Sequence, residues 1–178
     1  MSHYVQGYPV EVIANRQFTV STMNSNMPGR SANNSTPASQ AWLAANEAIY
    51  VPIFFTDPCI VYRVGVGAGG TAGGNFDIGL YDMAGTKLQS TGTQVRTLSA
   101  FNQVDWTDLT VFPGWYYAAL SADSTANYSG VAPAAGLCEA AGVCKQATAF
   151  TLPATATLTR TDRALIPGIV FTVRSIAV

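Results

Sequence analysis

The sequence predicts an all-β protein: an antiparallel, jelly-roll-like β-sandwich preceded by an extended N-terminal arm. Apolar and polar residues alternate with a period of two in several short segments, which is typical of strands with one buried face. The 16 glycines and 9 prolines mark frequent turns between these segments. With 178 residues the chain is long enough for one well-buried core and short for two. We therefore divide it into an arm, residues 1–40, and a β-sandwich domain, residues 41–178.

The arm contains two segments that are predicted to form short strands, Tyr8–Ile13 and Gln17–Val20. Residues 21–39 are mostly Ser, Asn, Thr, Gly and Pro, and such a segment buries too little apolar surface to offset its ordering entropy. Two interpretations stay open, a flexible lead and an extended arm that becomes ordered on a neighbouring subunit by adding to its sheet edge. The alternating apolar residues of the arm are its candidate interface residues: Tyr8, Val10, Val12, Phe18 and Val20.

The first strands of the sandwich are predicted at Ala48–Phe55 and Cys59–Val66. Pro52 cannot donate a hydrogen bond to a strand ladder, so the first of them is expected to be an edge strand or to carry a bulge. Trp42, just before it, is expected to cover one end of the core. Alternation in the second strand predicts one face that carries Tyr62, Val64 and Val66.

Two β-hairpins are predicted in the middle of the chain, with no helical period between them. Asn75–Asp82 and Lys87–Thr91 form the first, joined by a short turn. Asp105–Phe112 and Trp115–Leu120 form the second, and the turn dipeptide Pro113-Gly114 joins them.

The last third of the chain has a looser pattern. Residues 124–146 are predicted to be a long, insertion-like loop with a short helix interrupted by glycines within 134–143. Short strand segments are predicted at Thr148–Leu152 and Ala156–Thr159, and a closing strand at Ile169–Arg174.

No residue pattern in the sequence indicates a catalytic, cofactor or metal site. Gly65–Gly70 matches G-x-G-x-x-G, but a phosphate-binding loop must open a helix, and here a strand follows. His3 is the only histidine, so neither a nucleophile–base pair nor a zinc set of the usual spacing is present. The closely spaced carboxylate pairs are separated by odd numbers of residues, which on regular strands points them to opposite faces: Asp77 with Asp82, and Asp105 with Asp108. We therefore predict a protein that is not an enzyme.

Composition narrows the choice of partners. Charged residues make up 11% of the chain, against about 25% in ordinary soluble domains. A surface this poor in charge is either covered by other proteins or built from Ser, Thr, Asn and Gln, and both apply here; the low charge indicates an assembled state. A net charge of −1 with scattered basic residues argues against nucleic acid, and no apolar run reaches the length that spans a bilayer. Because no signal peptide is recognisable, we expect assembly in a cytoplasm. There Cys138 and Cys144, which are close enough in sequence to pair, are expected to stay free, and Cys59 to be a buried thiol.

Three consecutive aromatic residues, Trp115, Tyr116 and Tyr117, place at least one large ring on each face of their strand. One face belongs to the core. The rings on the other face are either covered by loops, buried in a protein interface or available to stack on a sugar ring. Trp115 and Tyr117 are therefore added to the candidate interface residues.

The segments GGNFDIGLYDMAGTKLQSTG and DWTDLTVFPGWYYAALSAD resemble a β-sandwich module that recurs in structural proteins of tailed bacteriophages. ANEAIYVPIFFTDPCIVYRVGV upstream and FTLPATATL downstream extend the resemblance to residues 41–158. The family has no catalytic residue to transfer. The resemblance implies a place in a virion, which is assembled in the host cytoplasm, and does not distinguish head from tail.

These observations together predict a non-enzymatic virion protein that acts through protein–protein contacts. A capsid decoration, or cement, protein is favoured because the chain is short, has no coiled-coil or collagen-like shaft and carries an arm suited to gripping a lattice. The alternative is a tail or baseplate adhesin that binds a host surface glycan. Large aromatics occur on both faces of several strands, so we expect further copies of the chain as partners in a homotrimer. The other expected partner is the major capsid protein or another virion protein.

Overall fold

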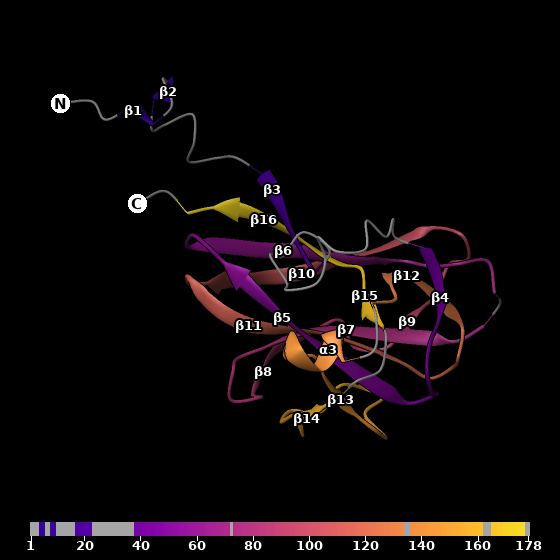
Figure 1. Ribbon diagram of the computed structural model, residues 1–178. Coiled ribbons are helices and arrows are strands. Elements are labelled where there is room, and N and C mark those ends of the chain that lie inside the picture. Colours follow the sequence, from indigo (N-terminus) through magenta and orange to yellow (C-terminus); the bar gives the residue numbers. More distant parts are fainter. Residues whose placement is uncertain are drawn as a thin grey trace.

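The computed structural model describes residues 4–5, 8–9, 17–22, 38–71, 73–133, 136–161 and 165–176. Within these residues two large antiparallel sheets, one of four strands and one of seven, pack face to face (Figure 1). A three-stranded sheet closes one end of this pair, and a two-stranded sheet lies near the N-terminus. The predicted antiparallel β-sandwich is confirmed.

The seven-stranded sheet has the order β14-β13-β5-β11-β7-β8, with β9 also paired to β7. Its β7–β8 hairpin is the first of the two predicted hairpins. β5 is central, but β13 pairs only with Ala48–Tyr50, so Pro52 lies where that side of β5 is a local edge. The strands are β5 (Glu47–Phe55), β7 (Asn75–Tyr81), β8 (Lys87–Ser90), β9 (Gln94–Val95), β11 (Gly114–Ala122), β13 (Cys144–Gln146) and β14 (Thr159–Arg160).

The four-stranded sheet has the order β10-β6-β16-β3. Its strands are β3 (Gln17–Ser21), β6 (Cys59–Gly67), β10 (Phe101–Val111) and β16 (Ile169–Ser175), the last of which confirms the predicted closing strand. The face predicted for Tyr62 is wrong. The register of β6 with both neighbours shifts near this residue, so Val61 and Val64 are both buried and Tyr62 is half-exposed. An irregularity of this kind reverses the alternation of a strand.

The second predicted hairpin is also wrong. β10 pairs with β6 in the four-stranded sheet, whereas β11 pairs with β5 and β7 in the seven-stranded sheet. Pro113 therefore lies in a connection that crosses from one sheet to the other, and residues 56–58 make a second crossing of this kind between β5 and β6. Gly114, at the end of the first crossing, has a φ of 155°.

Two segments of the expected arm are strands of the sandwich itself. β3 pairs with β16 along its whole length, and β4 (Ala38–Ala41) pairs with β12 (Asn127–Val131), which in turn pairs with β15 (Ile166–Pro167). Val20 packs against the core, and pairing satisfies the backbone groups of both segments. This corrects the expectation that residues 1–40 all precede the sandwich. Tyr8 lies in β2 (Tyr8–Pro9), which pairs with β1 (Tyr4–Val5), and Val10 and Val12 lie outside the described residues.

The main hydrophobic core fills the space between the two large sheets. Trp42 covers one end of it, as predicted: the residue is 2% exposed, and its indole N–H donates to the Glu47 carbonyl at 3.1 Å. A second cluster, which includes Tyr50, Tyr81 and Tyr117, lies on the outer face of the seven-stranded sheet. Residues 147–158 cover this cluster, so that sheet is apolar on both faces.

The predicted short helix is α3 (Leu137–Ala140), bounded by Gly136 and Gly142 at φ values of 82° and 80°. Residues 148–152 form no strand, and of the two strand segments predicted here only the end of the second corresponds to one, β14. All three cysteines, Cys59, Cys138 and Cys144, are buried free thiols. Burial raises the pKa of the Cys59 thiol to about 11.

Candidate interaction site

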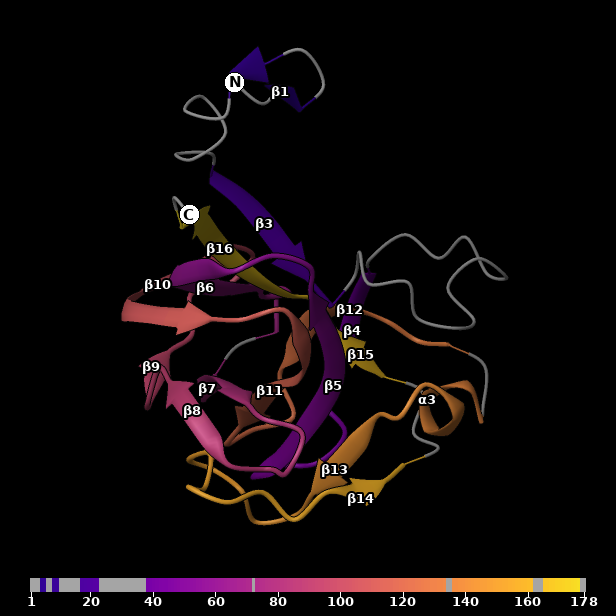
Figure 2. The same ribbon diagram turned by 90° about the vertical axis from the view of Figure 1, so that its left-hand side faces the viewer.

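Two of the connections that cross between the large sheets, residues 56–58 and residues 112–113, lie at the same end of the sandwich, and we call it the crossover end. Phe55 pairs with Gly114 in one sheet and Cys59 with Val111 in the other, so the two crossings are neighbours. β16 ends here with Ser175 opposite Cys59, and β3 begins here with Gln17 opposite Arg174. Figure 2 looks onto this end and shows β3 and β16 side by side above the crossings.

Three aromatic residues are exposed at the crossover end and form what we call the aromatic patch: Phe54 (42% exposed), Phe112 (64%) and Trp115 (52%). Phe54 and Trp115 are paired in register, and their ring centroids are 5.1 Å apart at a tilt of 54°. Tyr116 supports the patch from within, because its ring meets Phe55 edge-on and its hydroxyl donates to the Phe112 carbonyl at 3.1 Å.

The aromatic patch exists because the cover of the seven-stranded sheet ends before the sheet does. Trp115, Tyr117 and Ala119 lie on the same outer face of β11. Tyr117 (8% exposed) and Ala119 (fully buried) belong to the second hydrophobic cluster, beneath residues 147–158. Trp115 lies beyond this cover. The two candidate interface residues of β11 therefore separate, since Tyr117 is buried within the chain and Trp115 is on the surface.

The sequence pattern did not indicate Phe54 and Phe112 as interface residues. The outward direction of Phe54 follows from alternation along β5, but its exposure depends on where the cover ends. The exposure of Phe112 depends on the crossing between the sheets, and at this point the sequence predicted a hairpin instead. Of the arm residues, Val20 is packed on the core, so its side chain is engaged within its own sandwich. Only the backbone pairing of Phe18, with Val173, is described.

The cover itself is held by buried polar groups. Asp77 is fully buried, and its carboxylate accepts hydrogen bonds from the Leu152 N–H at 3.0 Å and the Thr91 hydroxyl at 3.1 Å. Lys87 donates to the Leu152 carbonyl at 2.8 Å, and the Tyr81 hydroxyl donates to the Pro153 carbonyl at 2.6 Å. Burial raises the pKa of the Asp77 carboxyl above its usual range. These side chains therefore have a structural role, which is to fasten residues 147–158 to the sheet.

A second buried polar group, Arg96, organises the opposite end of the sandwich. It is 6% exposed, lies over the Tyr128 ring at 5.1 Å, and donates to the carbonyls of Gly69 at 2.8 Å, Thr71 at 2.5 Å and Asn127 at 2.6 Å. The glycine-rich connection after β6 is thus anchored to β12. Its carbonyl groups converge on a cation, the opposite of the amide cradle that binds phosphate.

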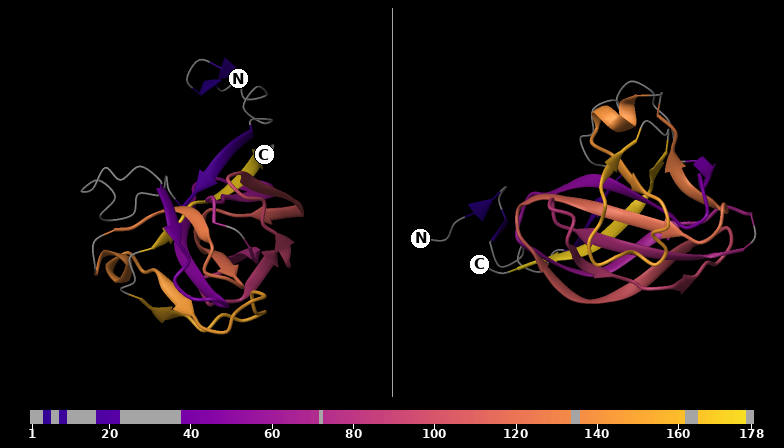
Figure 3. Two further views of the ribbon diagram at one scale, coloured as in Figure 1. Left: turned by 90° about the vertical axis from the view of Figure 1, so that its right-hand side faces the viewer. Right: turned by 90° about the horizontal axis from the view of Figure 1, so that it is seen from below.

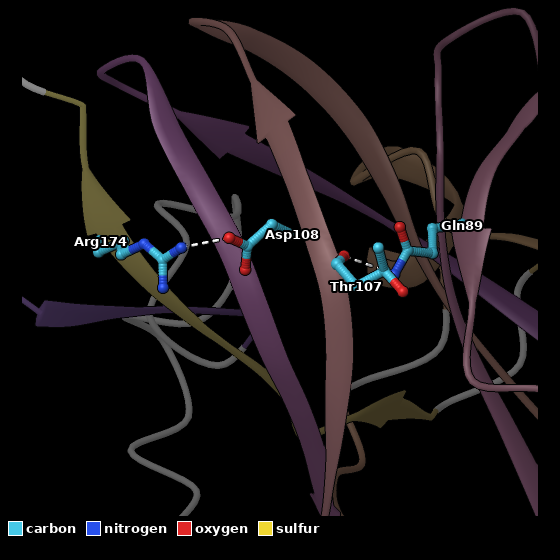
Figure 4. A network of polar contacts seen from close by, with 4 residues as sticks. All are labelled: Gln89, Thr107, Asp108 and Arg174. Atoms are coloured by element: carbon cyan, nitrogen blue, oxygen red, sulfur yellow. Dashed lines mark hydrogen bonds and ion pairs between the residues drawn. The ribbon is translucent and has the colours of Figure 1, made fainter.

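The outer face of the four-stranded sheet carries exposed charges. Arg63 pairs with Asp105 at 2.5 Å, and Arg174 pairs with Asp108 (Figure 4). Both arginines lie over the Tyr62 ring, at 5.8 and 5.4 Å. The expectation that Asp105 and Asp108 point to opposite faces is wrong, because the register of β10 shifts between them. Figure 4 also shows the Gln89 amide donating to the Thr107 carbonyl, at 2.9 Å, which links the edges of the two sheets.

Among the described residues, no group of three or more His, Cys, Asp or Glu side chains is placed to hold a metal ion. In the same part of the chain, no helix is both long and apolar enough to cross a membrane.

No family model matches this sequence, and no curated protein matches it. Two solved structures are similar over most of the chain. One is the structure of infectious bursal disease virus Gx strain, with 10% identity, a TM-score of 0.36 and coverage of 91% of this chain and 37% of that chain. The other is the crystal structure of the T13 IBDV viral particle, with 9% identity, a TM-score of 0.33 and coverage of 92% and 36%. The chain thus spans little more than a third of each, and similarity at this level assigns it no function.

Proposed function

We propose that this chain is a non-enzymatic structural protein of a bacteriophage virion, and within that class a capsid decoration protein that assembles as a homotrimer. The observation that carries the proposal is the aromatic patch. Large aromatic side chains anchor protein interfaces, and here three of them are exposed together at the end where the chain enters and leaves the sandwich. The partners are further copies of the chain and the major capsid protein or another virion protein.

Two further observations support the proposal. The resemblance of residues 41–158 to the sandwich module of phage structural proteins implies a virion context. The buried polar side chains also have structural roles: Asp77 fastens the cover of the seven-stranded sheet, and Arg96 anchors the glycine-rich connection. The resemblance does not distinguish head from tail, but a sequence without a coiled-coil or collagen-like shaft favours the head.

The second candidate function is a tail or baseplate adhesin that binds a host surface glycan. The observation in its favour is the group of exposed charged side chains around the half-exposed Tyr62 ring, where Arg63 and Arg174 lie over the ring and pair with their acidic partners. Sugar rings stack on aromatic faces, and their hydroxyl groups form hydrogen bonds with charged side chains.

Copy number separates these two functions. Quantitative gel densitometry of purified virions should find hundreds of copies per particle for a decoration protein, and a few dozen at most for an adhesin. If the aromatic patch makes the contact, Trp115→Ala should lower incorporation by about tenfold or more. Phe101→Ala is the matched control, because Phe101 is also 52% exposed but lies at the opposite end of β10. Equal incorporation of both variants would contradict a role for the patch.

A further inference from the structure

The aromatic patch alone is too small for a stable interface. Large aromatic side chains bury about 150–250 Å² each, so the exposed fractions of Phe54, Phe112 and Trp115 correspond to roughly 300 Å². A stable interface buries about 800 Å² on each partner. If two copies met only patch to patch, the contact would cover less than half of that area. A further segment of the chain must therefore contribute.

The N-terminal lead, residues 1–16, enters the sandwich beside the patch. β3 begins at Gln17, opposite Arg174, and this point lies at the crossover end together with Gly114 and Phe55. The seven residues between the β1–β2 pair and β3 span about 23 Å when extended, and the β1–β2 pair adds to this reach. The lead is therefore long enough to reach the crossover end of an adjacent copy.

The described parts of the lead lie away from the chain's own sandwich. β1 and β2 form a two-stranded sheet of their own. All views place this sheet beyond the crossover end, clear of both large sheets (Figures 1, 2 and 3). The sequence of the lead nevertheless carries apolar residues at alternate positions, Tyr8, Val10 and Val12, which form one apolar face when the segment is extended.

We infer that the lead of one copy packs on the aromatic patch of a neighbouring copy, so that each subunit gives one lead and receives another. This inference rests on the proposed self-association and names its contact. The apolar face of residues 8–12 supplies the area that the patch lacks. The rings of Phe54 and Trp115 pack on each other at a tilt of 54°, with centroids 5.1 Å apart, so they do not present one flat face to a sugar. A contact of lead to patch is heterologous, and such a contact forms a ring, for example a trimer, when the rotation between successive copies closes.

Complementation between two full-length variants tests the contact. The lead variant carries Val10→Asp with Val12→Asp, and the patch variant carries Trp115→Ser. We expect each alone to be monomeric by light scattering at concentrations at which the wild type associates. An equimolar mixture should form a heterodimer and nothing larger, because it retains one intact lead and one intact patch. Phe101→Ser, at the other end of the sandwich, should associate like the wild type.

Tryptophan fluorescence gives a direct readout of the docked lead. Trp42 and Trp106 are 2% and 7% exposed, so acrylamide quenches mainly Trp115. In the mixture only the lead variant retains Trp115, and its quenching constant should fall about twofold when the patch variant is added. Near-ultraviolet circular dichroism of each variant checks that the fold is retained.

Three results would overturn the inference. The first is association of the patch variant to the same extent as the wild type. The second is a mixture that stays monomeric while the wild type associates. In both cases the proposed decoration function would still stand on particle copy number. The third is a wild type that stays monomeric at tens of micromolar and on particles, which would also remove the proposed homotrimer.

Discussion

The two ends of the sandwich each carry a tryptophan, which is buried at one end and exposed at the other. Trp42 is 2% exposed and packs edge-on against Tyr128 with centroids 5.5 Å apart, beneath the three-stranded sheet of β4, β12 and β15. Trp115, at the crossover end, is 52% exposed and touches Phe54, which is itself on the surface. In the left-hand view of Figure 3, the end that β4, β12 and β15 cover faces the viewer.

The difference does not come from the residue type or its local sequence. Trp42 is buried because β4 pairs with β12, more than 80 residues away in the chain. The Thr22 hydroxyl, next to β3, donates to the Pro167 carbonyl of β15 at 2.6 Å and so joins the three-stranded sheet to the four-stranded one. At the crossover end, the described residues beyond the crossings include no strand that covers Trp115. One end is thus closed within the chain, and the other presents apolar surface to a partner.

The largest contrast is expected from truncating the two tryptophans. Trp42→Ala should lower the free energy of unfolding by about 3–5 kcal/mol, because it leaves a cavity in the core. Trp115→Ala should change it by less than about 0.5 kcal/mol in the monomer, because the side chain is on the surface. Urea unfolding measures both. A similar loss of unfolding free energy in the two variants would contradict one closed and one exposed end.

The closed end should also depend on Arg96. Arg96→Met keeps much of the side-chain volume but leaves the carbonyls of Gly69, Thr71 and Asn127 without their donor, and should cost about 2–3 kcal/mol. Arg174→Met is the control, because its ion pair is exposed and such pairs contribute little. Thermal melts that are unchanged for Arg96→Met would show that the anchor is dispensable.

At the crossover end, the main structural requirement is the backbone of Gly114. Its φ of 155° disfavours a side chain, although a Cβ there would meet only Tyr116, at 3.8 Å. Gly114→Val should therefore cost about 1–2 kcal/mol through backbone strain, and Gly114→Ala less. Thermal melts of the two variants measure the order. Unchanged midpoints for both would show that the crossing tolerates a side chain.

The smallest effect concerns the cover whose end leaves Trp115 exposed. Burial raises the pKa of Asp77 in the folded state above its unfolded value of about 3.9, so the folded state holds this proton more tightly. The stability that the protonated carboxyl contributes is complete below that unfolded value and is lost as the pH rises through the folded pKa. Asp77→Asn removes this loss, so its unfolding free energy should fall less than that of the wild type above about pH 4.

Urea titrations at several pH values check the sign of this effect. Asp57→Asn, at an exposed position, is the matched control and should follow the wild type. A wild type whose stability rises relative to Asp77→Asn over the same pH range would contradict a pKa raised by burial.

Local patterns in the sequence were enough to predict the fold class and several elements. A period of two, ended by turn residues, correctly located the hairpin of β7 and β8 and the closing strand β16. Glycines on both sides of a short apolar run indicated α3. The large apolar Trp42 beside a strand indicated a buried end of the core. Each of these features depends on neighbours within a few residues, and so the sequence alone determined them.

Only the tertiary structure decided which apolar residues are on the surface. The turn at Pro113 reads as a hairpin from its sequence, but β10 and β11 join different sheets because each finds distant partners. A register shift, invisible in the sequence, exposes Tyr62. Trp115 and Tyr117 are two residues apart on the same face of β11. Tyr117 is buried and Trp115 exposed because residues 147–158 cover the first and end before the second. Strand pairing and covering loops bring together segments far apart in the chain, and local alternation carries no information about which distant segment pairs with or covers a given strand.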